Sequence, residues 1–100
     1  MYTTGTSTTA GKKDDKGKVR LDLVLPEFIE DVGQVLTFGA NKYGANNWQK
    51  VEDAKDRYYA AAMRHLLAWR KGEKQDESGC SHLAHAATNM MFLRWLEENE

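Results

Sequence analysis

Apolar residues recur at helical spacing in three stretches of the chain. The first begins at Pro26, which suits a first helical turn because its missing N–H has no partner there, and ends near Gly44. Its apolar face consists of Phe28, Ile29, Val32, Val35, Leu36 and Tyr43. Polar residues share another face, so the spacing predicts an amphipathic helix between Pro26 and Gly44.

Two further helices are expected. Asp53 is a natural N-cap for a helix that runs to Lys71 and ends before Gly72. Ser81 is expected to start a third helix that runs to about Glu97. Nearly every position in this third helix is apolar, so we expect it to be buried on all sides.

The N-terminal part contains little that a core could bury. Residues 1–12 are rich in Thr, Gly and Ser, which predicts a disordered tail. Residues 19–25 alternate briefly between apolar and polar positions, but a lone strand has no partner for a sheet. We therefore expect an extended arm that lies across the helices. The chain is predicted to be an all-α bundle, with a single domain over residues 13–100.

Charge and composition limit the classes of function. The formal net charge of −1 gives no reason to expect a nucleic-acid polymer as a partner. The lone Cys80 excludes an internal disulfide framework, and no apolar run approaches the roughly 18 residues of a membrane helix. The N-terminus also lacks the apolar core of a signal peptide. We expect a cytoplasmic protein with no membrane partner.

A polar stripe interrupts the apolar third helix. His82, His85 and Asn89 fall within about 60° of one another when they are placed on a helix. Buried polar groups without hydrogen bonds are costly, so these side chains need partners, such as a metal ion, a carboxylate or a reacting group. His65 lies in the apolar face of the second helix, where it is either a satisfied core histidine or a residue that meets this stripe.

Four segments, in order along the chain, carry a resemblance to a known family. They read KGKVRLDLVLP, FGANKYGANNW, AAMRHLLAW and DESGCSHLAHAATN. Together they resemble the dATP/dGTP diphosphohydrolase N-terminal family of small phage and bacterial proteins, which is grouped with the MazG-like all-α nucleoside triphosphate pyrophosphohydrolases. The resemblance covers about residues 12–97. It implies a MazG-like helical bundle that hydrolyses a purine (deoxy)nucleoside triphosphate, such as dATP or dGTP, to the monophosphate and pyrophosphate. If the protein is phage-encoded, its location would be the host cytoplasm.

The resemblance also implies a divalent cation, Mg²⁺ or Mn²⁺. MazG-like enzymes hold magnesium with an E-x-x-E motif on one helix and an E-x-x-D motif on a later one. Here Glu27 and Glu30 read E-x-x-E, whereas the third helix offers His82 and His85 at the spacing of the second motif. We expect Glu30, His82 and His85 to be catalytic. The expected metal ligands are Glu27, Glu30, Asp31, Asp76 and Glu77.

A simpler explanation of these acidic residues stays open. Glu27, Glu30 and Asp31 lie in the first turns of a helix, where negative charge complements the helix dipole. Asp76 and Glu77 precede the third helix and could cap it by the same effect.

The loop that follows the first helix could bind a base. It combines a cation, amides and two rings, which could stack on a purine and hydrogen-bond its edge. Alternatively, it is a turn that Trp48 anchors in the core. Cations elsewhere could neutralise the triphosphate. The residues expected to bind substrate are Lys18, Arg20, Lys42, Tyr43, Asn47, Trp48, Arg64, His65 and Asn89.

Two other classes of function remain open. A non-catalytic module of the same fold would bind a nucleotide or a partner protein without turnover. A small zinc-binding interaction protein would use His65, His82 and His85 as ligands.

The third helix also bears on assembly. It carries more apolar surface than the two other helices can cover, and monomers rarely tolerate a large exposed apolar patch. We therefore expect an obligate homodimer or a tetramer built from dimers, in which two chains could share one site.

Overall fold

The computed structural model describes residues 11–99, and its regular elements are helical. They are the 3₁₀ turn η1 (Leu21–Leu23), α1 (Pro26–Tyr43), the 3₁₀ turn η2 (Asn47–Lys50), α2 (Ala54–Arg70) and α3 (His82–Asn99). Within residues 11–99 the only β-type pairing is a single bridge between Gln75 and Ser81. The predicted all-α class and its three helices are confirmed. None of the described helices combines the length and apolar character that crossing a membrane requires.

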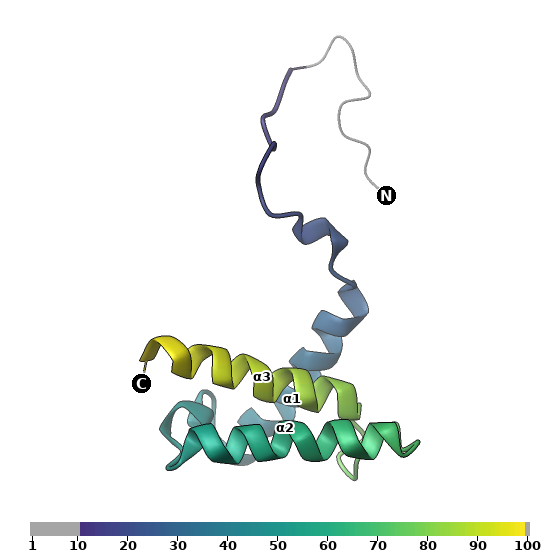
Figure 1. Cartoon of the computed structure of the whole chain (residues 1–100), viewed down its shortest axis with the longest axis vertical. Helices are drawn as coiled ribbons and strands as arrows, with labels where there is room; N and C mark the ends of the chain where they lie inside the picture. The colour runs from purple at the N-terminus through teal and green to yellow at the C-terminus, as the bar shows by residue number, and fades with distance from the viewer. Residues whose placement is uncertain (1–10, 100) are drawn as a thin grey trace.

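The helices α2 and α3 lie side by side and run in opposite directions, joined by the loop of residues 71–81 (Figure 1). The helix α1 crosses them and packs chiefly against α3. Residues 11–25, which precede α1, project away from this pair of helices. The helix α3 is therefore the central element, because both other helices contact it.

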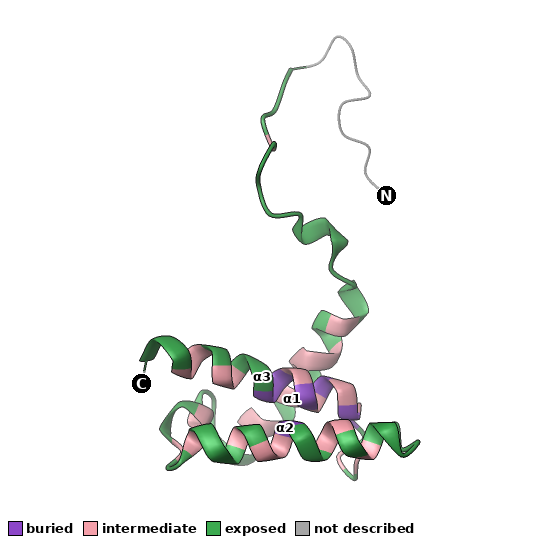
Figure 2. Cartoon of the chain, in the orientation of Figure 1, coloured by how far each residue is buried: buried purple, intermediate pink, exposed green. Residues whose placement is uncertain are grey.

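Burial is concentrated in the first half of α3 (Figure 2). Ala84 and Ala86 are 0% and 1% exposed, and side chains this small let the neighbouring helices approach closely. The buried residues of the described chain are Ala62, Cys80, His82, Ala84, Ala86, Thr88 and Asn89. Further along α3, Met90 is 52% exposed, so the expected burial on all sides holds only for the first half of this helix.

The two ends of α2 differ in how well the sequence predicted them. Gly72 adopts a φ of 106°, which favours glycine, and its N–H donates to the carbonyl of Trp69, as expected for a glycine that ends a helix. Asp53 does occupy the N-cap position, but its side chain makes no capping hydrogen bond. Its backbone is left-handed, with a φ of 54°, whereas a capping side chain requires an extended backbone. The prediction that Asp53 caps α2 is therefore wrong.

The N-terminal arm does not lie across the helices. Instead, residues 21–23 form one 3₁₀ turn, and two hydrogen bonds of 2.8 Å between Arg20 and Asp22 close it. Val19 and Leu21 are 81% and 73% exposed. The helix α1 buries no residue, so a single chain offers no apolar groove along its first turns for the arm to fill. Most of the predicted disordered tail, residues 1–10, lies outside the described residues.

Candidate functional site

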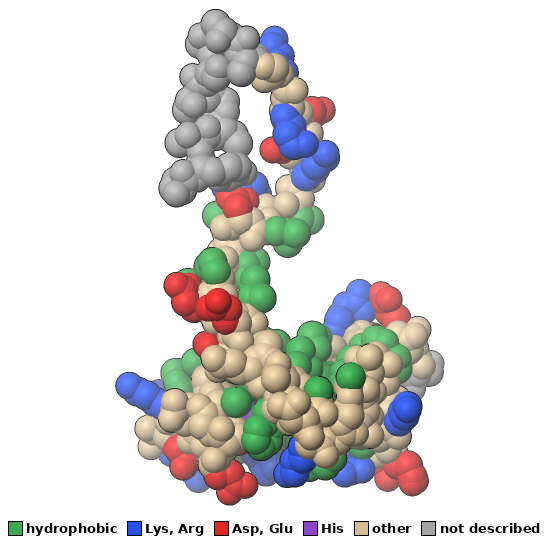
Figure 3. Space-filling model, turned by 180° about the vertical axis from the view of Figure 1, so that it is seen from behind, with side chains coloured by type: hydrophobic (Ala, Val, Ile, Leu, Met, Phe, Trp, Pro, Cys, Tyr) green, Lys and Arg blue, Asp and Glu red, His purple; other side chains and the backbone are tan. Residues whose placement is uncertain are grey.

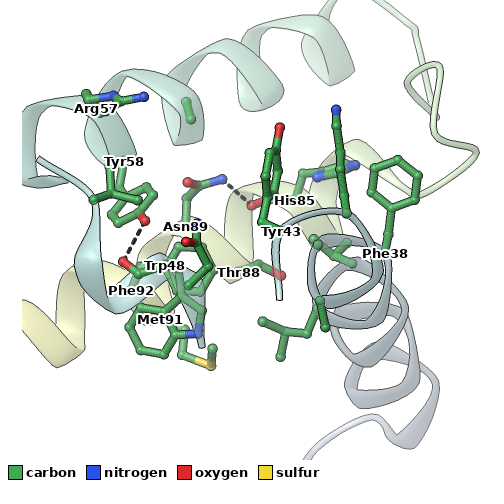
Figure 4. A pocket seen from close by; sticks show the side chains of 18 of the residues that line it. Phe38, Tyr43, Trp48, Arg57, Tyr58, His85, Thr88, Asn89, Met91 and Phe92 are labelled. Carbon is green, nitrogen blue, oxygen red and sulfur yellow. Dashed lines mark hydrogen bonds between the residues drawn. The ribbon is translucent and has the colours of Figure 1, made fainter. Parts of the chain in front are cut away.

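An open pocket of about 1050 Å³ lies among the second half of α1, the loop around η2, α2 and α3 (Figure 4). It brings together residues that are far apart in the sequence. The expected site residues that line it are Lys42, Tyr43, Asn47, Trp48, Arg64, His85 and Asn89.

One wall of the pocket is cationic. Arg57 and Arg64 line it, and both are exposed at the surface of α2. They lie seven residues apart, which is two helical turns, so they share a face. Asp56 adds one carboxylate to the same lining. Guanidinium groups in this position suit an anionic ligand such as a phosphate chain.

The opposite wall carries accessible aromatic rings. Tyr43 is 62% exposed, and the Nζ atom of Lys42 lies 5.2 Å from the centroid of its ring. The same Nζ atom lies 6.0 Å from the centroid of the Phe38 ring. Lys42 therefore sits close to both rings at the C-terminal end of α1, where a flat ligand could stack.

Trp48 serves mainly to anchor the loop. Its ring stacks on Phe92 at 4.4 Å and meets Trp95 edge-on at 5.2 Å. The hydroxyl group of Tyr58 donates a 2.7 Å hydrogen bond to the carbonyl of Trp48. This is the anchored turn that the sequence left open as an alternative, although Trp48 also lines the pocket.

The residues of α3 form the floor of the pocket. Thr88 donates a 2.7 Å hydrogen bond to the carbonyl of Ala84, and the Asn89 amide donates one of 2.9 Å to the carbonyl of His85. These bonds hold both polar side chains against their own helix, and Figure 4 shows Asn89 beside His85. The stripe that the sequence predicted is thus divided: His85 and Asn89 line the pocket, whereas His82 does not.

His82 turns instead toward a chain of polar partners. Its Nε2 atom lies 2.6 Å from a carboxylate oxygen of Glu73, and its Nδ1 atom lies 2.8 Å from the Nδ1 atom of His65. The ring of His65 also stacks on that of His85, with centroids 4.3 Å apart. Burial, followed by the neighbouring His85 and His82, lowers the pKa of His65 to about 4. His65 is therefore neutral near neutral pH.

Asp76 binds His85 rather than the end of α3. Its carboxylate lies 3.1 Å from the Nε2 atom of His85, and it accepts hydrogen bonds from the hydroxyl group and the N–H of Ser78. Burial alone would raise the pKa of Asp76, but the bonds from Ser78 and the proximity of His85 lower it overall. The helix α3 begins next to Ser81, where the sequence predicted its start, and the Ser81 hydroxyl caps it, so Asp76 does not take that role.

One set of three candidate ligand atoms stands out among the described residues. The nearest ligand atoms of His65, Asp76 and His85 all lie within 4.8 Å of one another. The set joins α2, the loop that follows it and α3.

The acidic residues of α1 do not join this cluster. Glu27 and Glu30 are exposed and Asp31 is partly exposed, and within residues 11–99 they form no group of three close ligands with Asp76 or Glu77. Figure 3 shows acidic side chains on the projecting part of the molecule.

The other expected residues also lie apart from the large pocket. Glu30 lines a separate hollow of about 690 Å³ together with Ser78 and Cys80. Lys18 and Arg20 lie on the projecting arm, and Arg20 is bound to Asp22. The expected site residues are therefore divided among separate places, which include the large pocket, the hollow lined by Glu30 and the projecting arm.

Arg57, which lines the large pocket, and Glu73 and Ser78, which contact His82 and Asp76, were not among the residues expected from the sequence. Arg57 shares the face of Arg64, and the seven-residue spacing was the available signal. Glu73 and Asp76 read E-x-x-D, but in the loop before α3 rather than on the helix where that motif was expected. Ser78 gave no signal, since its contact with Asp76 depends on the turn that the loop makes.

Comparisons with known proteins agree with the resemblance. A protein of Salmonella phage PMBT28 described as a dATP/dGTP diphosphohydrolase is 45% identical over 92 residues, which is 89% of this chain and 30% of that protein. The chain thus spans about 30% of the length of this curated relative. No solved structure matches the chain. The family described as dATP/dGTP diphosphohydrolase, N-terminal, matches residues 8–100, and the chain belongs to this family.

Proposed function

We propose that this chain forms the nucleotide site of an enzyme that hydrolyses dATP and dGTP to the monophosphate and pyrophosphate, with Mg²⁺ or Mn²⁺. The observation that carries the proposal is the large pocket, whose lining combines two arginines, accessible aromatic rings and His85. The named activity of the phage relative supports the choice of substrates. We assign the activity to the cytoplasm, that of the host if the protein is phage-encoded.

The two walls of the pocket suit the two ends of a nucleotide. Arg57 and Arg64 would bind the triphosphate, because guanidinium groups make strong, directional bonds to phosphate oxygens. Tyr43 would stack on the purine, and the Asn47 amide would hydrogen-bond its edge. The pocket is large enough for a nucleotide, since ligand sites commonly enclose about 300–1,000 Å³.

His85 is the group best placed to handle a proton. It lines the pocket, and its Nε2 atom contacts the Asp76 carboxylate at 3.1 Å. During hydrolysis a bond forms between a water oxygen and a phosphorus atom, the P–O bond to the leaving group breaks, and the water loses a proton. An imidazole paired with a carboxylate would accept that proton. Ser78, which is 3.2 Å from the same Nε2 atom, would help to orient the ring.

The expected all-carboxylate metal site does not fit a single chain. Within residues 11–99 the carboxylates of α1 form no close cluster of ligand atoms with Asp76 or Glu77, so we assign no step of the reaction to a metal held by them. A homodimer or a dimer-of-dimers tetramer would bring the α1 carboxylates of one copy close to the pocket of another. We retain Glu30 as a proposed catalytic residue on that basis. His82 does not line the pocket, so we propose that it acts through its contact with His65.

The proposal is tested by incubating the chain with each dNTP and NTP in the presence of Mg²⁺ or Mn²⁺ and separating mono- from diphosphate products. We expect dGMP or dAMP together with pyrophosphate. Arg64→Gln should weaken substrate binding about tenfold or more, because a hydrogen bond to a charged group contributes about 1.5–3 kcal/mol. Arg70→Gln is the matched control, since Arg70 is exposed on the same helix and does not line the pocket.

Three outcomes are informative. A nucleoside diphosphate product would contradict the proposed reaction. Tight binding of dGTP without turnover would favour a non-catalytic nucleotide-binding module. Equal effects of Arg64→Gln and Arg70→Gln would contradict the assignment of the pocket.

A further inference from the structure

We propose that His65, Asp76 and His85 form a binding site for a transition-metal ion, such as Zn²⁺, Mn²⁺ or Fe²⁺, distinct from a magnesium site built of carboxylates. Two imidazoles and one carboxylate offer two nitrogen ligands and one oxygen ligand. Such a set suits transition metals, whereas Mg²⁺ prefers oxygen ligands alone.

The spacing of the ligand atoms is close to what one ion requires. Two ligands at about 2.1 Å from a shared ion are separated by about 3.0–3.4 Å when they subtend angles near 90–110°. The Nε2 atom of His85 and a carboxylate oxygen of Asp76 already lie 3.1 Å apart. The three ligand atoms all lie within 4.8 Å of one another, so a small movement of the side chains would bring them to the separation that one ion requires.

The contact between His65 and His82 prepares the His65 ring for a metal. In the neutral tautomer of His82 that donates its Nε2–H to Glu73, the Nδ1 atom carries a lone pair. The Nδ1–H of His65 donates to that lone pair over 2.8 Å, which leaves the Nε2 lone pair of His65 free. A carboxylate or ring that binds the far nitrogen of a ligating histidine is the usual support of such a site. Glu73 and His82 therefore act as positioning residues.

The ion would join three parts of the fold. His65 belongs to α2, Asp76 to the connecting loop and His85 to α3. Binding at all three would fasten the loop of residues 71–81 to both helices, so metal should stabilise the protein against unfolding. The stacked rings of His65 and His85, which are nearly parallel at 6°, would tilt as their lone pairs converge.

This inference rests on geometry and not on the proposed hydrolysis. The Nε2 atom of His85 cannot carry a metal and a proton at once. The metal-bound and metal-free proteins would therefore differ in whether this atom is protonated. The readout below is metal binding, and its failure would leave the hydrolysis proposal standing.

The test uses the full chain after treatment with a chelator. Zn²⁺, Co²⁺ and Mg²⁺ are titrated separately, with calorimetry and the visible absorption of Co²⁺ as readouts and circular dichroism as the check of folding. We expect one Zn²⁺ or Co²⁺ per chain, a rise in Tm, and no competition from millimolar Mg²⁺.

Variants separate ligands from neighbours. His65→Gln and Asp76→Asn should each weaken Zn²⁺ binding at least a hundredfold. Because Asp76 lies in a loop, Asp76→Asn should leave the helices folded. Glu77→Gln, which removes the adjacent exposed carboxylate, should leave binding unchanged. Glu73→Gln should weaken binding about tenfold to a hundredfold by removing the support of His82. Failure of the parent chain to bind Zn²⁺, or equal losses in Asp76→Asn and Glu77→Gln, would overturn the proposal.

Discussion

The imidazole of His65 shows how neighbours decide the chemistry of a residue. It lies on the apolar face of α2, which alone is typical of a structural histidine. The structure adds His82 at hydrogen-bond distance and His85 stacked on the ring. Partial burial, and then the two neighbouring imidazoles, lower the pKa of His65 and favour its neutral form, which is the form that accepts a proton or a metal.

Lowering the pH from 6.5 to about 4 should destabilise the metal-free protein through His65. Its folded pKa of about 4 lies below the ordinary value of 6.5, so the unfolded chain binds a proton that the folded protein does not. The free energy of unfolding therefore decreases as the pH is lowered from 6.5 to about 4. Thermal melts with a chelator present should show a smaller decline of Tm for His65→Gln than for the parent, and parallel declines would contradict the assignment.

Tyr43 and Trp48 should separate binding from stability. Trp48→Ala removes a ring that stacks on Phe92 and Trp95, so we expect a loss of about 3 kcal/mol of folding free energy. Tyr43→Ala removes an exposed ring, so stability should change by less than about 0.5 kcal/mol. It should still weaken dGTP binding about tenfold, because base stacking contributes about 1–3 kcal/mol. Denaturant melts and calorimetry measure the two effects, and a Tyr43→Ala variant with unchanged dGTP affinity would count against the pocket.

At the scale of elements, the loop of residues 71–81 organises the histidine cluster. The N–H of Asp76 donates to the carbonyl of Cys80, and the N–H of His82 donates to the carbonyl of Lys74, so the loop closes on itself before α3 begins. It carries Glu73 toward His82 and Asp76 toward His85. The position of α3 relative to this loop therefore determines whether both pairs form.

Removal of the Ser81 cap should weaken α3 at its start. The Ser81 hydroxyl oxygen accepts hydrogen bonds from the N–H groups of Leu83 and Ala84, at 3.1 and 3.2 Å. Ser81→Ala should lower the free energy of unfolding by about 1 kcal/mol. Ser81→Asp should retain most of it, because a carboxylate also caps a helix. Urea melts that show equal losses for the two variants would argue against capping.

Local signals predicted the helices well, and long-range arrangement was harder to predict. Pro26, Gly72 and Ser81 mark helix ends through their own backbone and side-chain chemistry, which any sequence shows. The predicted position of the arm across the helices was wrong, because that position depends on whether another surface covers the arm. The loop and α3 supplied the right residue types for the site, but the sequence could not show that Glu30 would lie in a different hollow from His85.

At the scale of the whole molecule, apolar side chains lie exposed on several elements. Leu21 and Leu23 on the arm are 73% and 71% exposed, and Tyr59 and Leu67 on α2 are 60% and 53% exposed. Monomers seldom tolerate so much apolar surface without a partner. The prediction of a dimer or tetramer is therefore supported by the exposed apolar side chains of the arm and α2, in addition to those of α3.

Light scattering at micromolar concentration should give a mass at least twice the 11.4 kDa of one chain. Leu21→Glu and Leu67→Glu place a charge on the arm and on α2, respectively. The substitution on the face that forms the contact should lower the measured mass of the assembly. The other variant then serves as the control. A stable mass near that of one chain for the parent protein would contradict assembly and any site shared between chains.

Nuclear magnetic resonance of the chain titrated with dGTP shows whether the nucleotide binds in this pocket or elsewhere on the chain. We predict that amide shifts change from Gly44 to Trp48 and around Arg57, Arg64 and Asn89, all of which line the pocket. Residues of the arm and the last turn of α3 should not change. Shifts confined to the arm or to the first turns of α1, with none around the pocket, would show that the nucleotide does not bind in the pocket.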